Sequence, residues 1–385
     1  MMYGLAMISR LYAHNFRCLE NFELALGDLP SVLLIGRNGA GKSTVGAVLE
    51  VLQRIGRGTT RVGDLVKPRD LTRGRTDSPV RFEIEVSLKN RHYSYSVAFE
   101  LPDGFRELRV LEERLSVDGK PIFSRELAQV RLARTGRTSE AGFRIDWHLV
   151  ALPIVQDLSS NDPLFLFREW LANVLILRPV PSLMKGSSED ATLRPDTQVT
   201  NIGAWFAGIN AHSPSAYSNI QNYLKELMPD FQEIKNPILL RDFRNLSFIF
   251  YDGVGSAELA LEDMSDGERC FFVFALTIAA NMAYGPVLCF WDEPDNFLAP
   301  AEIGPSIVAL RKAFRDTGQL IVTSHNPEAI ERFSDENTLV LYRNSHLEPT
   351  VKTSAAELRA SKKFEGGFVD ALRRGDIPPA GDPGA

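Results

Sequence analysis

The stretch Gly36-Arg37-Asn38-Gly39-Ala40-Gly41-Lys42-Ser43 decides the fold, because it fits the pattern G-x-x-x-x-G-K-[ST]. It lies between an apolar run at residues 31–35 and a segment with helical spacing that starts at residue 41. Glycines in such a loop let backbone N–H groups surround phosphates, and the helix N-terminus adds partial positive charge. The alternative is a tight turn with a stray lysine, and the flanking strand and helix disfavour it.

This pattern predicts ATP and Mg²⁺ as ligands. Lys42 is expected to bridge the β- and γ-phosphates, and the Ser43 hydroxyl to hold the metal. The predicted nucleotide-binding residues of this phosphate loop are Gly36, Asn38, Gly39, Ala40, Gly41, Lys42, Ser43 and Thr44.

Two adjacent carboxylates end a second apolar stretch, Val287-Leu288-Cys289-Phe290-Trp291-Asp292-Glu293. A buried strand has no structural use for such a pair, because removing charges from water is costly. Asp292 is therefore expected to be a metal ligand together with Ser43, and Glu293 to accept a proton from the attacking water. The alternative is an acidic turn that opens the next helix.

A serine and a glycine begin a strongly apolar helix in Met264-Ser265-Asp266-Gly267-Glu268-Arg269. The N–H groups and hydroxyl of such a turn suit an anion, while Ser265 and Glu268 also fit a capping box, and both interpretations can hold together. Further on, His325 ends the run Ile321-Val322-Thr323-Ser324-His325. It is either a structural hydrogen bonder or a catalytic group at the γ-phosphate.

Composition is that of an ordinary globular protein, since 44% of the 385 residues are hydrophobic and 24% are charged. No run of about 18 apolar residues occurs, so no membrane span is predicted. Three separated cysteines, Cys18, Cys270 and Cys289, suit reduced thiols and predict a cytoplasmic protein. A net charge of −6 does not indicate a nucleic-acid binder.

Composition changes along the chain predict four segments. Residues 1–150 form an N-terminal ATPase lobe, in which alternating patterns from residue 80 onward predict antiparallel hairpins. Residues 151–235 form a mainly helical insertion with helices over 170–175 and 216–228, and residues 236–350 form a C-terminal ATPase lobe. Residues 351–385 are a tail, and its end from Pro378 is predicted to be disordered.

A local excess of basic residues lies between the phosphate loop and the hairpins. Two interpretations stay open: contact with nucleic-acid phosphates, so that DNA is a candidate partner, or a solvated loop. The basic residues are Arg54, Arg57, Arg61, Lys67, Arg69, Arg73, Arg75 and Arg81.

The order of the four motifs (phosphate loop, serine turn, acidic strand end, histidine) resembles the ATPase head of the ABC superfamily. His14-Asn15-Phe16-Arg17 and the stretch from Asp292 to Pro300 resemble the SMC/RecF type, and Ser265-Asp266-Gly267-Glu268 is similar to the turn of OLD-like ATPases. The resemblance implies an α/β fold: a P-loop NTPase head of ABC type with an antiparallel β subdomain and a helical insertion.

The resemblance also implies roles and partners. Ser265, Gly267 and Glu268 would meet the nucleotide of a second subunit, and Asp295 would lie in a loop that crosses the dimer interface. His325 would be the switch histidine, and Arg17 would approach the phosphates. Two ATP molecules sandwiched between heads imply a homodimer or a higher oligomer.

Two features depart from the pattern. A glutamine that couples the two lobes in such heads is not assigned, because Gln53 lies too close to Lys42, and Gln129 and Gln156 have no distinguishing context. The nuclease domain that follows the head in OLD proteins is not recognisable after His325.

The function predicted from the sequence is an ATPase that drives or gates a separate effector, such as a nuclease or toxin, in DNA maintenance or phage defence. A scaffold or clamp that binds ATP with little turnover is the alternative. A transporter ATPase subunit is disfavoured by the loop after Glu293 and by the large insertion.

Overall fold

The computed structural model describes residues 6–27, 29–133, 141–240 and 242–361. The chain divides into two compact units, one comprising residues 1–174 and 335–385 and the other residues 175–334. The first unit therefore combines residues from before residue 175 with residues from after residue 334. The division into four segments stays a prediction. The tail from Pro378 lies outside the described residues.

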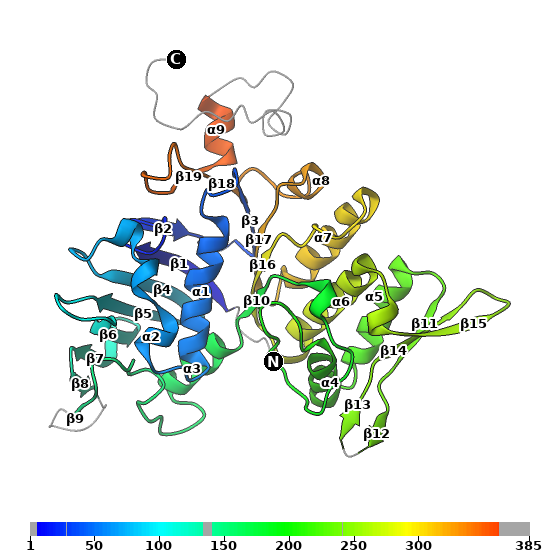
Figure 1. The fold of residues 1–385 in the computed structure, drawn as a ribbon, viewed down its shortest axis with the longest axis horizontal. Coiled ribbons are helices and arrows are strands. Elements are labelled where there is room, and N and C mark those ends of the chain that lie inside the picture. The colour runs from blue at the N-terminus through cyan, green and yellow to red at the C-terminus, as the bar shows by residue number, and fades with distance from the viewer. Residues whose placement is uncertain (1–5, 28, 134–140, 241, 362–385) are drawn as a thin grey trace. The chain divides into compact units, whose positions relative to one another are not determined.

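The first unit contains an antiparallel sheet with the strand order β2-β1-β4-β5-β6-β7-β8-β9 (Figure 1). Alternate residues of β4 are buried, from Val80 through Val86, and this confirms the predicted hairpins. The strands are β1 (Met7–His14), β2 (Phe22–Ala25), β4 (Val80–Leu88), β5 (Arg91–Glu100), β6 (Arg109–Val117), β7 (Lys120–Glu126), β8 (Gln129–Leu132) and β9 (Ala141–Arg144).

Two helices of this unit pack beside that sheet. In α3 (Pro163–Ala172), Phe167 stacks on Tyr93 of β5 at a centroid distance of 6.0 Å. In turn, α1 (Lys42–Gly56) packs against α3 and buries Val45, Val48, Leu49 and Leu52, as its helical spacing predicts. Short helical turns follow α1 at α2 (Val62–Leu65), η1 (Pro68–Asp70) and η2 (Thr72–Gly74).

A second group of strands in this unit carries the phosphate loop. The fully buried β3 (Ser31–Ile35) pairs in parallel with β18 (Thr338–Tyr342), and β18 pairs antiparallel with β19 (Val351–Ser354). The helix α9 (Ala355–Ser361) follows β19. Residues from the two ends of the chain therefore meet directly beside the loop after β3.

A buried ion pair joins strands of the antiparallel sheet to the segment that follows them. Glu113 of β6 and Arg125 of β7 are fully buried, and Arg125 Nη1 lies 3.8 Å from Glu113 Oε2. The Glu113 carboxylate accepts hydrogen bonds from the backbone N–H groups of Ala151 and Leu152 at 2.6 and 2.8 Å, and from the Tyr95 hydroxyl at 3.0 Å. This network fixes residues 151–152 to the sheet.

The second unit contains three parallel strands among its described residues, in the order β10-β16-β17. Every residue of β10 (Leu175–Leu177), β16 (Leu288–Asp292) and β17 (Gln319–Thr323) is buried, as expected of a parallel sheet. The helix predicted over 170–175 is wrong in its second half. It ends at Ala172 with Asn173 as C-cap, because the apolar residues beyond pair with β16 instead.

Helices surround α6 (Asp266–Tyr284), which is buried over most of its length and contacts α4, α5 and α7. Asn281 ties its end in place: Nδ2 donates to Ala313 O at 2.9 Å, and Oδ1 accepts from Val287 N at 3.2 Å. The surrounding helices are α4 (Ile202–His212), α5 (Ala216–Leu227), α7 (Pro300–Phe314) and the short α8 (Pro327–Ile330). The helix predicted over 216–228 is confirmed.

An antiparallel arm extends from this helical part of the second unit (Figure 1). It is built from β11 (Phe231–Lys235), β14 (Ser247–Tyr251) and β15 (Ser256–Ala260), with the small hairpin β12 (Ile238–Leu240) and β13 (Phe243–Arg244) inserted. Throughout the described part of the chain, no helix combines the length and apolar character that a membrane span requires.

Candidate functional site

The phosphate loop has a backbone that requires glycine at two positions. At Gly36 the φ angle is 148°, and a Cβ atom there would lie 2.0 Å from Leu341 O of β18. At Gly41 the φ angle is 104°, and a Cβ atom would lie 2.7 Å from Thr350 Oγ1. Both positions confine the chain to a path that a side chain would block.

The remaining predicted nucleotide-binding residues follow this path. Lys42 is only 6% exposed, and its ammonium group donates to Gly36 O at 2.8 Å, within the loop. Ala40 is buried and Thr44 is half-buried, while Asn38, Gly39 and Ser43 are exposed. The loop therefore exposes Asn38, Gly39 and Ser43 at the surface of the first unit, at the N-terminus of α1.

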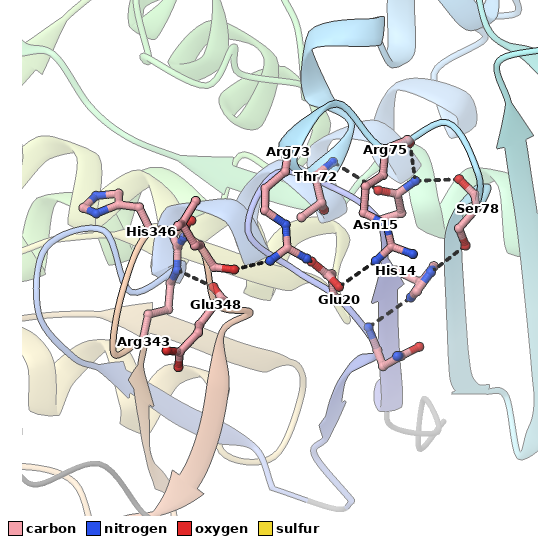
Figure 2. Close-up of polar contacts among 12 residues, drawn as sticks. His14, Asn15, Glu20, Thr72, Arg73, Arg75, Ser78, Arg343, His346 and Glu348 are labelled. Atoms are coloured by element: carbon pink, nitrogen blue, oxygen red, sulfur yellow. Dashed lines mark hydrogen bonds and ion pairs between the residues drawn. The ribbon is translucent and has the colours of Figure 1, made fainter.

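Residues from three distant segments form a collar around the phosphate loop. We define the collar as residues 14–20, 72–78 and 343–350, and Figure 2 shows the polar contacts that join them. Asn15 is 1% exposed, and its Nδ2 donates to Ser78 O at 2.6 Å while its Oδ1 accepts from Thr72 N at 3.1 Å. The first two segments are thereby fixed to each other.

The third collar segment contacts the loop itself. Arg343 Nη1 donates to Gly39 O at 3.2 Å, and Thr350 Oγ1 donates to Ala40 O at 3.0 Å. Arg73 joins this segment to the others, since its guanidinium donates to Leu347 O and pairs with Glu20. These residues hold the loop backbone from outside, and nothing in their local sequence indicated that role.

Arg17 lies in the collar beside the start of α1. The neighbouring Cys18 Sγ lies 3.5 Å from Thr44 Oγ1, while Arg17 Nε pairs with Asp70 at 3.1 Å. The Arg17 guanidinium carbon also lies 5.0 Å from the centre of the Phe16 ring. A phosphate contact by Arg17 stays a prediction.

Four of the eight basic residues between residues 54 and 81 pair with carboxylates. Arg61 pairs with Glu107 at 2.9 Å, and Arg75 pairs with Glu20 at 3.0 Å. Arg73 pairs with Glu20 as well, and Arg81 pairs with Glu112. These contacts favour the interpretation as a structured surface loop over a nucleic-acid site.

In the second unit, Asp292 lies at the carboxyl end of β16. It is 8% exposed, and register places it opposite Thr323 at the end of β17. Thr323 Oγ1 donates to Asp292 Oδ1 at 2.7 Å and accepts from the backbone N–H of Glu293 at 3.0 Å. The hydroxyl of one strand thus aligns both carboxylate residues of its neighbour.

Glu293 and His325 meet beside this strand end. Glu293 has a φ angle of 53°, in the left-handed region that is uncommon for residues other than glycine. His325 Nε2 lies 3.3 Å from Glu293 Oε1, and Asn296 Nδ2 donates to Oε2 at 2.8 Å. Both side chains are partly exposed, at 32% for Glu293 and 42% for His325. The glutamate is therefore oriented from two sides and open to solvent.

Asp295 follows in the same loop but is buried. Its Oδ2 accepts from Ser324 Oγ at 3.0 Å, while Oδ1 has no hydrogen-bond partner among the described residues. Burial raises the pKa of this carboxyl above its ordinary value, an effect that the Ser324 hydrogen bond only partly offsets.

The serine turn forms the capping box expected from its sequence. Ser265 Oγ accepts from Glu268 N at 3.3 Å, and Glu268 Oε2 accepts from Ser265 N at 2.8 Å. Gly267 lies next to the loop after Glu293, since a Cβ atom there would lie 3.1 Å from Phe297 O. The serine turn and the acidic loop therefore belong to one local surface of the second unit.

Sequence reasoning missed one charged neighbour of Asp292. Arg178, directly after β10, donates from Nε to Asp292 Oδ2 at 2.8 Å. The strand β10, which neighbours β16, is therefore followed directly by an arginine that contacts Asp292.

Gln53 is not assigned as the residue that couples the two lobes. It is buried in α1, and its side chain donates to Val174 O at 2.5 Å.

The residues present fit a magnesium ion bound through a nucleotide. Among the described residues, no three His, Cys, Asp or Glu side chains gather into a metal site of their own. Magnesium, however, commonly takes only one or two protein oxygens and completes its shell with phosphates and water. Each unit holds one oxygen donor of that kind: the exposed Ser43 hydroxyl in the first unit and the Asp292 carboxylate in the second.

The family follows from a match that includes both parts of this site. A family model described as "AAA domain, putative AbiEii toxin, Type IV TA system" matches residues 31–331. That span covers most of the chain and runs from β3 to just beyond His325. The chain belongs to this AAA family. No curated protein matches the sequence significantly.

Solved structures show the fold of this family member. The chain is similar to an SMC head bound to the C-terminal winged-helix domain of ScpA, with a TM-score of 0.55 and 15% identity over 92% of this chain and 99% of that one. An Smc head with an extended coiled coil, derived from Pyrococcus furiosus, gives a TM-score of 0.53 and 12% identity over 92% and 98%. These likenesses confirm the predicted α/β head fold and show that it is similar to the fold of SMC heads.

The structure brings the predicted site residues together in two groups. Arg17 and the phosphate loop lie in the first unit, whereas Ser265, Gly267, Glu268, Asp292, Glu293, Asp295 and His325 lie in the second. Within the second group, Glu293 and His325 are in contact, and Asp292 shares Thr323 with Glu293.

Proposed function

We propose that this AAA family member binds ATP with Mg²⁺ and hydrolyses it. The observation that carries the proposal is the group at the strand ends of the second unit, where Glu293 is held between His325 and Asn296 beside the buried Asp292. A left-handed, partly exposed glutamate with two orienting partners suits a general base. The two partners fix the direction of the carboxylate, and its exposure lets the attacking water reach it.

The chemistry follows from these side chains. A water oxygen attacks the γ-phosphorus, its proton passes to the Glu293 carboxylate, and the bond from phosphorus to the β-phosphate oxygen breaks to give ADP and phosphate. His325 orients the carboxylate through the 3.3 Å contact. Lys42 holds the phosphates, and Mg²⁺ held by Asp292 and Ser43 would neutralise their charge.

Dimerisation is part of the same proposal. The serine turn at Ser265, Gly267 and Glu268 begins a long helix, so its N–H groups suit the γ-phosphate of a second subunit. Phe297, in the same loop as Asp295, lies against that turn, so this loop would lie at the dimer interface. A homodimer or a higher oligomer closed around ATP then follows.

The proposed biological role is the gating of a separate effector in the cytoplasm. The description of the family names a putative toxin of a type IV toxin–antitoxin system, which supports a link to a toxic activity. Phage defence or DNA maintenance is the proposed setting. A direct role for DNA has weaker support, because the basic stretch is paired with carboxylates. Expression of wild-type protein and of a Lys42→Ala variant in cells that carry the neighbouring genes would show whether nucleotide binding controls growth.

Two substitutions test the enzymatic proposal. Glu293→Gln is expected to bind ATP normally but to lose about 100-fold or more of the phosphate-release rate, because the general base is gone. Lys42→Ala is expected to lose ATP binding itself. Binding by calorimetry and phosphate release by a coupled assay separate the two effects.

The matched control is Glu331→Gln, an exposed glutamate after α8, which should behave as wild type. Hydrolysis by Glu293→Gln at the wild-type rate would refute the assignment of the base.

A further inference from the structure

Arg178 occupies a fixed place at the end of β10. The parallel register pairs Leu177 with Trp291, so the next residues of both strands, Arg178 and Asp292, lie side by side. The backbone N–H of Arg178 donates to Thr197 O at 2.7 Å, which holds the main chain. The guanidinium reaches across and donates from Nε to Asp292 Oδ2 at 2.8 Å.

The two partners differ sharply in their exposure. The side chain of Asp292 is 8% exposed, whereas that of Arg178 is 53% exposed. A buried carboxylate needs compensation for its lost hydration, and here Thr323 donates to one oxygen and Arg178 to the other. The arginine keeps most of its contact with water, so it can leave Asp292 at small cost, while Asp292 cannot remain charged without a replacement.

A magnesium ion is such a replacement. It binds carboxylate oxygens at about 2.0–2.1 Å and carries twice the charge of a guanidinium. A metal ion and Arg178 cannot both approach the same side of Oδ2 without repulsion. Mg²⁺ must therefore displace the Arg178 guanidinium from Oδ2 in order to bind there.

We propose that Arg178 is a positioning residue that competes with Mg²⁺ for Asp292. It holds the carboxylate aligned before the metal arrives and thereby raises the Mg²⁺ concentration at which metal-bound nucleotide is retained. This inference rests on the proposed ATP site, and it adds a determinant of metal requirement that the sequence motifs do not contain.

The experiment is a Mg²⁺ titration of nucleotide binding with the full chain. Fluorescent methylanthraniloyl-ADP is bound in EDTA-buffered solution, and Mg²⁺ is raised until binding saturates, so that neither turnover nor ATP-driven dimerisation contributes. Arg178→Ala and Arg178→Gln are expected to lower the half-saturating Mg²⁺ concentration by about three- to tenfold, the range of one partly exposed ion pair. Arg178→Lys keeps the charge and should remain close to wild type.

Controls separate the possible failures. Arg332→Ala removes an exposed arginine that pairs with Glu328 at 3.7 Å, and it should leave the midpoint unchanged. An unchanged or raised half-saturating Mg²⁺ concentration in both Arg178→Ala and Arg178→Gln would overturn the inference, whatever their melting temperatures. So would nucleotide binding by wild type that ignores Mg²⁺. A wild-type protein that binds no ADP even with Mg²⁺ would instead refute the proposed function, and the inference with it.

Discussion

Three carboxylates within four residues show how environment separates their roles. Asp292 is buried and accepts two hydrogen bonds from side chains, Glu293 is partly exposed and oriented by His325, and Asp295 is buried with one oxygen lacking a partner. The negative charge of Asp292 is thus compensated by its partners, and that of Glu293 is exposed to solvent. A negative charge on Asp295 is disfavoured by burial. The division matches a metal ligand, a base and a loop anchor.

Asp295 gives a prediction about pH. Burial raises its folded pKa above the unfolded value, so the folded state binds the proton more tightly. The contribution of Asp295 to the free energy of unfolding is then most favourable at low pH. It becomes less favourable as the pH rises from the ordinary aspartate range through the raised pKa. Asp295→Asn carries no charge, so its melting temperature relative to wild type should increase between pH 4 and pH 7.

The comparison needs a control carboxylate. Asp316→Asn removes an exposed charge after α7 and should show no such pH-dependent gain. A difference between Asp295→Asn and wild type that is constant over this pH range, or that shrinks toward neutrality, would contradict the assignment of a penalised charge.

At the scale of elements, the buried pair of Glu113 and Arg125 holds residues 149–152 against the antiparallel sheet. Arg125 donates to Leu149 O, and Glu113 accepts from Ala151 N and Leu152 N. Glu113→Ala should reduce the free energy of unfolding by about 3–5 kcal/mol, because it leaves the buried charge of Arg125 uncompensated and two backbone donors without partners. Denaturant titration of the purified protein measures this loss.

Two further variants calibrate that result. Glu107→Ala breaks the exposed pair with Arg61 and should cost about 0–1 kcal/mol. The double variant Glu113→Leu/Arg125→Met should recover much of the loss, since it removes both charges together. A cost below about 1 kcal/mol for Glu113→Ala alone would mean that the network does not stabilise the sheet.

Elements whose signals are local could be predicted from sequence. The strand before Gly36, the helix after Gly41 and the capping box at Ser265 each depend on residues within a few positions. Arg178 could not be predicted in the same way, because its partner lies 114 residues away and only the register of β10 with β16 brings them together. Likewise, the helix predicted over 170–175 ends before Asn173, because the residues that follow form β10 and pair with β16.

At the scale of the whole molecule, contacts between residues distant in the sequence again explain why the collar could not be predicted. Arg343 and Thr350 contact the phosphate loop because β18 pairs with β3, a contact between distant parts of the chain. Composition changes cannot reveal such a return, because they report only on residues that are consecutive in the sequence, whereas the first unit combines residues 1–174 with residues 335–385. The family match from residue 31 to 331 nevertheless includes both the phosphate loop and the acidic strand end.

The central claim is that one nucleotide is held by Lys42 of one subunit and by the serine turn of another. Light scattering after size exclusion tests it most directly, with Glu293→Gln protein in Mg²⁺ and ATP. The account predicts that the molar mass doubles relative to nucleotide-free protein, and that Lys42→Ala/Glu293→Gln keeps the nucleotide-free mass. A Glu293→Gln protein that binds ATP but keeps an unchanged mass would contradict it.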